Sequence, residues 1–110
     1  MSAAITIVGH DEDNRIIKTT GEVVPLPPPA NGTDYQLSEL RSFVGAQYIE
    51  LVRIDDRNFM VVDEDYLAKR PPFNRIATEM YNEMLFLNGY LDESHIVLGD
   101  VAIIDSTQVF

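Results

Sequence analysis

The sequence predicts a small α+β domain, in which a mainly antiparallel sheet of about five strands packs with two helices. The chain has 110 residues, the size of a single domain. Residues 44–65 contain two apolar runs joined by a short polar turn, a pattern typical of a β-hairpin. Residues 76–85 carry apolar side chains at helical spacing. We therefore expect residues 1–110 to form one domain, with an N-terminal hairpin (1–19) and a short tail (105–110).

The N-terminal hairpin is expected from two short apolar runs. Residues 3–8 (AAITIV) and 15–18 (RIIK) predict strands, and the polar residues between them predict a turn. The acids from Asp11 to Asp13, beside His10, suggest a metal-binding loop. They lack the glycine and the distal glutamate of the calcium-binding pattern, so we expect an exposed turn and no metal.

A short edge strand and the first helix come next. Residues 22–26 predict an edge strand, because Pro25 has no N–H to donate to a sheet. Three prolines from Pro27 onward favour an extended connector over a proline-rich ligand motif. Apolar residues at helical spacing then predict a helix over residues 35–44, and Gly45 is suited to its C-cap.

The central hairpin contains an acid whose environment is open to two interpretations. Residues 48–54 and 59–62 predict its strands, with residues 55–58 as the turn. Glu50 falls between apolar neighbours in the first strand. It is either a buried acid that needs a cationic partner such as Arg53, or an acid at a solvent-facing or edge position.

The last helix and strand complete the predicted domain. Asn74 is a good N-cap for the second long helix, which the Asn-Gly pair at 88–89 ends. Residues 95–104 are nearly all apolar and predict a central strand, in which Gly99 indicates a bulge or a sharp twist. We expect the apolar end of the tail to dock on the domain.

The acidic composition limits the classes of partner. The formal net charge is −10, from 18 acids and 8 bases. Direct nucleic-acid binding is not expected, because it depends on neutralising phosphates with lysine and arginine. The charge either serves solubility or lets the chain act as a nucleic-acid mimic that blocks a basic protein. The chain has no cysteine, which excludes disulfides and thiolate chemistry.

Nothing in the sequence predicts membrane contact, export or a cofactor. No apolar run approaches the roughly 18 residues of a membrane span. The N-terminal residues lack the basic start of a secretory signal, so export is not expected. A Gly-rich phosphate loop is also missing, and no cofactor is expected.

No catalytic residue is nominated. His10 and His95 are far apart in the sequence, and neither lies in a catalytic motif. No serine lies in a nucleophile elbow. The enzymatic alternative is a small hydrolase that uses Glu50, Asp63 or His95.

The most specific chemical feature is the predicted helix start at Asn74. The free N–H groups of a first helical turn and the helix dipole favour an anion, and several bases lie nearby in the sequence. The candidate ligand-binding residues are Lys69, Arg70, Asn74, Arg75 and Thr78. They suit a phosphorylated, nucleotide-like small molecule. The alternative is internal pairing with the acids of residues 63–65.

Short motifs in a fixed order give the chain a family resemblance. They are TGEV at 20–23, LSEL at 37–40, VGAQYIE at 44–50, VDED at 62–65, PFN at 72–74, AT at 77–78 and GDV at 99–101. Over residues 20–104 this pattern resembles a family of small phage, plasmid and bacterial proteins known only as a domain of unknown function. The resemblance implies an origin in a phage or another mobile element and an intracellular location, in the cytoplasm of the host cell. It implies no activity.

Composition and resemblance together predict a non-enzymatic binding protein of a phage or mobile element. It would sequester a phosphorylated small molecule or a basic host protein, in the role of a host-defence inhibitor. The alternatives are an acidic nucleic-acid mimic and the small hydrolase. An exposed sheet edge would also allow a homodimer.

Overall fold

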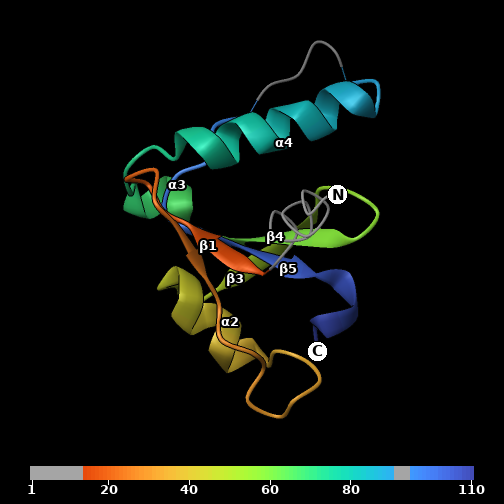
Figure 1. The fold of residues 1–110 in the computed structure, drawn as a ribbon. Helices are drawn as coiled ribbons and strands as arrows, with labels where there is room; N and C mark the ends of the chain where they lie inside the picture. Colours follow the sequence, from red (N-terminus) through yellow and green to blue (C-terminus); the bar gives the residue numbers. More distant parts are fainter. Residues whose placement is uncertain (1–13, 91–94) are drawn as a thin grey trace.

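The structure is a computed structural model, and it describes residues 14–90 and 95–110. Its strands are β1 (Arg15–Ile17), β2 (Val23–Pro25), β3 (Ile49–Arg53), β4 (Asn58–Asp63) and β5 (Val101–Asp105). Its helices are α2 (Leu37–Val44), α3 (Tyr66–Lys69), α4 (Arg75–Leu87) and the short 3-10 helix η1 (Ser106–Gln108). The strands form one antiparallel sheet, and the two longer helices lie on its opposite sides (Figure 1). The predicted α+β domain, with about five strands and two helices, is confirmed.

The sheet consists of two hairpins joined by the last strand. Its order is β2-β1-β5-β4-β3, so β5 pairs with β1 on one side and with β4 on the other. Both hairpins come from neighbouring stretches of sequence, β1 with β2 and β3 with β4. The central position of β5, predicted from its nearly continuous apolar residues, is confirmed.

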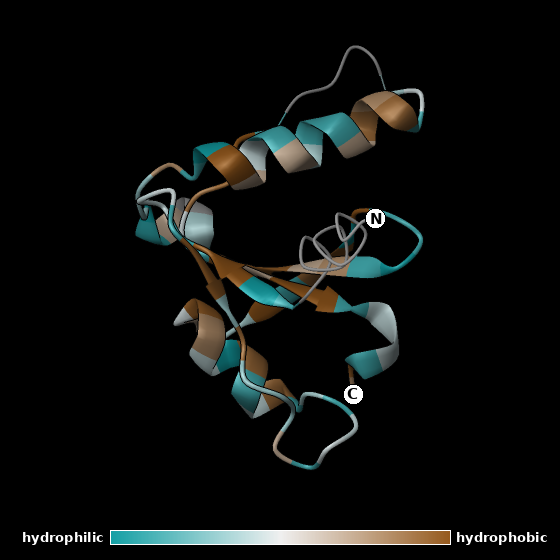
Figure 2. Ribbon diagram, in the orientation of Figure 1, coloured by the Kyte–Doolittle hydropathy of each residue, from teal (hydrophilic) through white to brown (hydrophobic). Residues whose placement is uncertain are grey.

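Both faces of the central strands are buried, which explains their apolar sequence. Met60 and Val62 of β4 pack in a cluster that includes Ala77 of α4. Val61, between them, packs on the other face with Leu40 of α2. Alternate residues of β5 divide between the two clusters in the same way. In Figure 2 the central strands are brown, the colour of hydrophobic residues.

The last strand is shorter than predicted. It begins at Val101, whereas the prediction began at 95, because α4 takes up hydrogen-bonding groups of the preceding residues. That stretch makes one isolated β-bridge, between Leu98 and Phe73. The backbone bends at Gly99, where φ is +84°, as the predicted sharp twist requires.

The predicted caps of the two longer helices are confirmed. The side chain of Asn74 caps α4 by accepting a 3.0 Å hydrogen bond from the N–H of Ala77. Gly45 caps the other end of α2 in the left-handed conformation, with φ at 68°. That helix starts two residues later than predicted, because Tyr35 is fully buried and its hydroxyl donates to the carbonyl of Pro27.

The C-terminal tail packs on the domain through its apolar end. Val109 packs against the cluster beneath α2, so the predicted docking of the tail is confirmed for this residue. The predicted strand at 3–8 and the acids from Asp11 to Asp13 lie outside the described residues. The expected hairpin partner of that strand, β1, is paired on both edges, with β2 and β5. Of the helices that the structure describes, none is long and apolar enough to cross a membrane.

Candidate functional site

Polar side chains on one face of α4 form hydrogen bonds with the extended segment before β5, residues 95–99. We call each of these contacts a clasp and this stretch the clasped segment. The pairs are Asn82 with His95, Thr78 with Val97 and Asn74 with Gly99. Four helical residues rise about 6.0 Å, and two extended residues span about 6.6 Å. The two repeats nearly match, so every fourth helical side chain meets the backbone of every second residue of the segment.

Asn82 and Thr78 each make two hydrogen bonds to the segment, whereas Asn74 donates a single hydrogen bond to the carbonyl of Gly99. The Oδ1 of Asn82 accepts from the N–H of His95 at 2.8 Å, and its Nδ2 donates to the His95 carbonyl at 3.1 Å. The Oγ1 of Thr78 accepts from the N–H of Val97 at 2.9 Å and lies 3.3 Å from the carbonyl oxygen of Val97, to which it donates. The segment is therefore held at a fixed height along α4.

These bonds decide the role of two residues of the predicted anion site. Asn74 is completely buried, and its Nδ2 donates at 2.9 Å to the carbonyl oxygens of both Ile17 and Gly99. With its oxygen capping α4, all three of its hydrogen-bonding groups have partners within the chain. Thr78 is buried and bonded to Val97. The geometry gives neither side chain a role in ligand binding.

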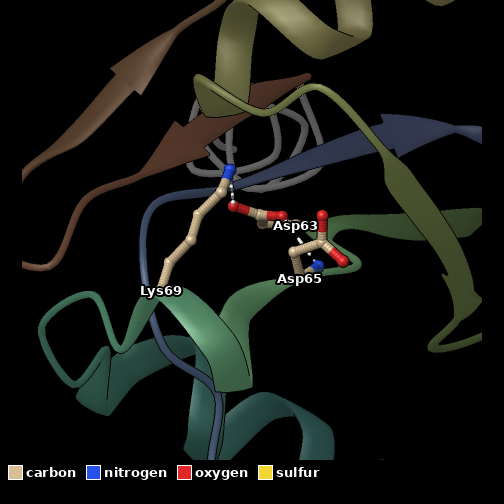
Figure 3. A network of polar contacts seen from close by, with 3 residues as sticks. All are labelled: Asp63, Asp65 and Lys69. Carbon is tan, nitrogen blue, oxygen red and sulfur yellow. Dashed lines mark hydrogen bonds and ion pairs between the residues drawn. The ribbon is translucent and has the colours of Figure 1, made fainter.

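Lys69 has an internal partner, as the alternative interpretation anticipated. Its Nζ lies 2.9 Å from Oδ2 of Asp63, a residue that is only 7% exposed (Figure 3). The other oxygen of Asp63 accepts from the N–H of Asp65 at 2.9 Å. This pair fixes α3 to the end of β4.

The two arginines of the predicted site do not take part in the Lys69–Asp63 ion pair. Arg75 forms an exposed ion pair with Glu79 at 2.9 Å, one turn along α4. Arg70 ends α3 in the left-handed conformation, with φ at 51°, and is exposed. The five predicted residues therefore make separate contacts, and no shared anion-binding arrangement is visible among them.

The surroundings of Lys69 do not favour an anion either. It lines an open hollow of about 310 Å³ together with Asp63 and Asp100. Gly45, at the C-terminal end of α2, lines the same hollow, and this end of a helix carries partial negative charge. Two carboxylates and a helix C-terminus face one ammonium group, so a phosphate would meet net repulsion.

A second cavity brings together four side chains that are far apart in the sequence. We call it the Glu50 cavity, and its polar and aromatic walls are Glu50, Tyr66, Tyr81 and His95. They come from β3, from the start of α3, from α4 and from the clasped segment. Apolar side chains of the sheet and of the segment complete the lining, among them Val52, Val62 and Val97.

The position of Glu50 settles its two interpretations. The side chain is exposed, so the prediction of a buried acid is wrong and the edge-position alternative is correct. β3 is an edge strand, and Glu50 pairs with Val62 on the face that α4 covers. Within the described residues its carboxylate has no hydrogen bond and no ion pair. An apolar neighbourhood on an edge strand is what made this acid look buried.

The rings in the cavity are arranged against one another. The centroids of Tyr81 and His95 are 5.1 Å apart, with the planes inclined at 49°. The Asn82 clasp fixes the backbone that carries the imidazole. No sequence motif joins residues 50, 66, 81 and 95, so only the folded chain reveals this group.

A wider acidic hollow lies on the same side of the sheet. It has a volume of about 430 Å³ and runs between the β3–β4 turn and the end of α4, where Asp55, Asp56 and Leu87 line it. The pKa of Asp55 lies below its ordinary value. Burial raises it, but hydrogen bonds from Arg57 and Asn58 and the charge of Arg57 together outweigh burial. This carboxylate therefore stays charged well into the acidic range.

Comparisons with protein-family models, with curated proteins and with solved structures gave no match. The family resemblance of residues 20–104 accordingly stays a prediction. In the part of the chain that the structure describes, no three histidine, aspartate or glutamate side chains are grouped to hold a metal ion.

Proposed function

We propose that this chain is a non-enzymatic binding protein that captures a basic protein partner. The observation that carries the proposal is the carboxylate of Glu50, which has no cationic partner among the described residues and lies at a cavity with aromatic walls. A carboxylate without an internal cation is available to a cation from outside. The resemblance noted above adds an origin in a phage or mobile element, and with it a host protein as the partner.

The internal use of basic residues supports the proposal. Arg53 stacks on the ring of Phe59 at 4.5 Å and donates to the backbone carbonyls of the β3–β4 turn. Lys69 and Arg75 are bound to acids of the chain itself. Many acids are left to face solvent, in keeping with the net charge of −10. A surface of this kind attracts a positively charged partner and speeds its association.

The phosphorylated-ligand form of the hypothesis has less support. Two of its five residues are buried and saturated with internal hydrogen bonds. The hollow around Lys69 is lined by two acids. A basic protein remains the partner that the charges of the described residues favour.

One observation favours the hydrolase alternative. Glu50 and His95, which the sequence nominated separately, line the same cavity. General acid–base catalysis requires a positioned side chain, most often an imidazole, and a catalytic imidazole is usually oriented by a hydrogen bond to its ring. No hydrogen bond of either side chain to another described residue is present. We therefore place this alternative second.

The proposal is tested by isolating the partner and measuring salt dependence. The tagged protein is expressed in a bacterial host, and the proteins retained with it are identified. One of them is then purified, and its Kd is measured at rising ionic strength. We expect a basic partner whose affinity falls steeply with salt, because exposed charges are screened. A retained set without basic proteins, or a Kd that salt leaves unchanged, would contradict the proposal. Turnover of ester or phosphoester substrates that Glu50→Gln abolishes would support the hydrolase.

A further inference from the structure

The Glu50 cavity has the chemistry of a receptor for one cationic side chain. We propose that it receives the head group of a lysine or arginine presented by the partner protein. This inference rests on the proposed function and names the contact through which the partner is recognised.

Charge is the first argument. Among the described residues that line this cavity, Glu50 is the one carboxylate, and none is a lysine or an arginine. The contrast with Asp63 is direct, since that acid already holds the ammonium of Lys69 at 2.9 Å. Of these two acids on the adjacent strands β3 and β4, Asp63 has a cationic partner within the described part of the chain and Glu50 has none there.

The aromatic walls are the second argument. Tyr66, Tyr81 and His95 line the cavity around the carboxylate. The faces of tyrosine rings attract ammonium and guanidinium groups, and such aromatic surrounds are used to recognise cationic ligands. A carboxylate beside several rings is therefore a better receptor for an organic cation than for a metal ion.

Size is the third argument. The cavity offers about 50 Å³ to the centres of water molecules. One water needs roughly 10–15 Å³ on this measure, so there is room for roughly three to five. An ammonium with its last methylenes, or a guanidinium, occupies that space. A nucleotide does not, because pockets for whole small-molecule ligands measure roughly 300–1,000 Å³.

The apolar walls and the rigidity of the site are the fourth argument. Val52, Val62 and Val97 suit the methylene stem of a long basic side chain, whose charged head then reaches the carboxylate. Val52 and Val62 lie on paired strands, and the Thr78 clasp fixes Val97. A cavity whose walls are already in place loses little entropy when it is filled.

A titration with short peptides tests the inference directly. The probes are acetyl-Gly-Lys-Gly-amide, its arginine analogue and its norleucine analogue, which has the stem without the charge. Binding is followed by NMR through the backbone amides of Glu50, Tyr66, Tyr81 and His95. We expect saturable shifts with the two cationic peptides and none with norleucine. Equal shifts with norleucine, or no shifts at these amides, would overturn the inference.

Variants separate the carboxylate from the rings. Glu50→Gln should weaken lysine-peptide binding at least about fivefold, whereas Glu64→Gln should leave it unchanged, because Glu64 is exposed and does not line the cavity. Tyr66→Phe should retain binding and Tyr66→Leu should lose it, because only the ring face is required. Identical binding by Tyr66→Phe and Tyr66→Leu would exclude the cation–π contact.

The same variants distinguish failure of the inference from failure of the proposed function. If the purified partner binds Glu50→Gln with unchanged affinity and still dissociates with salt, the binding function stands and the cavity is not its contact. If the lysine peptide binds but no basic partner is found, the cavity is a cation receptor and the proposed function fails. If Glu50→Gln loses partner binding and the control Glu64→Gln keeps it, the inference and the proposed function are both supported.

Discussion

The Nδ2 of Asn74 donates a 2.9 Å hydrogen bond to the carbonyl oxygen of Ile17, a residue 57 positions earlier in the chain. The same amide binds Gly99, and the side-chain oxygen caps α4. One completely buried side chain thus joins a strand, a helix and the segment that leads into the central strand. Its loss should affect the whole domain.

Replacing Asn74 by alanine removes a helix cap and leaves two carbonyl groups without their donors. A lost cap costs about 1 kcal/mol, and an unsatisfied buried group costs about 1–3 kcal/mol. We expect Asn74→Ala to lower the free energy of unfolding by at least about 3 kcal/mol, from one lost cap and two unsatisfied carbonyl groups, measured by urea denaturation. Asn88→Ala, at the exposed end of the same helix, is the control and should change it by less than about 1 kcal/mol. Equal effects of the two substitutions would refute this role of Asn74.

Thr78→Val keeps the shape of the side chain and removes the clasp on Val97. We expect a loss of about 1–3 kcal/mol, because both backbone groups of Val97 lose their side-chain partner in a buried place. Amide hydrogen exchange at residues 95–98 should speed up more than exchange in β4. Thr78→Ser retains the hydroxyl and should keep the protection. Uniform acceleration throughout the sheet would indicate that Thr78 has no local role.

Two glycines with positive φ allow a matched comparison. A Cβ at Gly99 would lie 3.2 Å from Cγ of Pro71, whereas a Cβ at Gly45 would meet no atom within 4 Å. Gly45→Ala should cost about 1 kcal/mol from the left-handed backbone alone. Gly99→Ala should cost more, about 2–3 kcal/mol, because steric crowding adds to the same strain. The measurement is the shift in denaturation midpoint of each variant, and equal costs would show that Pro71 moves freely aside.

Asp55 should make the stability depend on pH. Its pKa is lower in the folded chain than in the unfolded one. The stabilisation is therefore present above pH ~4 and disappears as the pH falls through the folded-state pKa. Asp55→Ala should lose roughly 0.5 kcal/mol at pH 7, because solvent screens this exposed carboxylate, and the difference should be smaller at pH 2. Denaturation of both proteins at the two pH values tests this, with Asp56→Ala as the control that should change little. A difference that persists unchanged at pH 2 would assign the effect to packing.

Lys69→Met should leave the buried carboxylate of Asp63 without its cation. Because Lys69 is partly exposed, we expect a loss of about 1–2 kcal/mol in the free energy of unfolding. The exposed Arg75–Glu79 pair provides a control, since Arg75→Met should cost less than about 0.5 kcal/mol. The double variant of Lys69→Met with Asp63→Asn should lose less than the sum of the single variants. Additive losses would mean that the two side chains do not interact in solution.

The local patterns of the sequence predicted the elements that local interactions determine. The central hairpin, the Asn74 cap and the Gly45 cap all depend on residues within a few positions of one another. The apolar run that ends in Ile104 predicted a strand buried on both faces. Such features need no knowledge of how distant segments meet.

The sequence patterns did not predict the contacts between segments that are distant in the chain. The apolar residues near 95 resemble a strand, but their hydrogen-bonding partners are side chains of α4, and β propensity does not contain that information. The basic residues near Asn74 are neighbours in the sequence, yet each has a separate environment in the fold. Glu50 and His95 line one cavity only because the side chain of Glu50 and the clasped segment lie on the same face of the sheet.

The central position of β5 has a consequence for the order in which the protein can assemble. During synthesis both hairpins leave the ribosome before residues 101–105, which join them through pairs such as Ile16 with Ala102. Until then, each hairpin carries an open edge, on β1 and on β4, with which β5 later pairs. Pairing of residues so distant in sequence is slow, because a long loop must close first. The nascent chain should therefore depend on chaperones until its last strand is available to close the sheet.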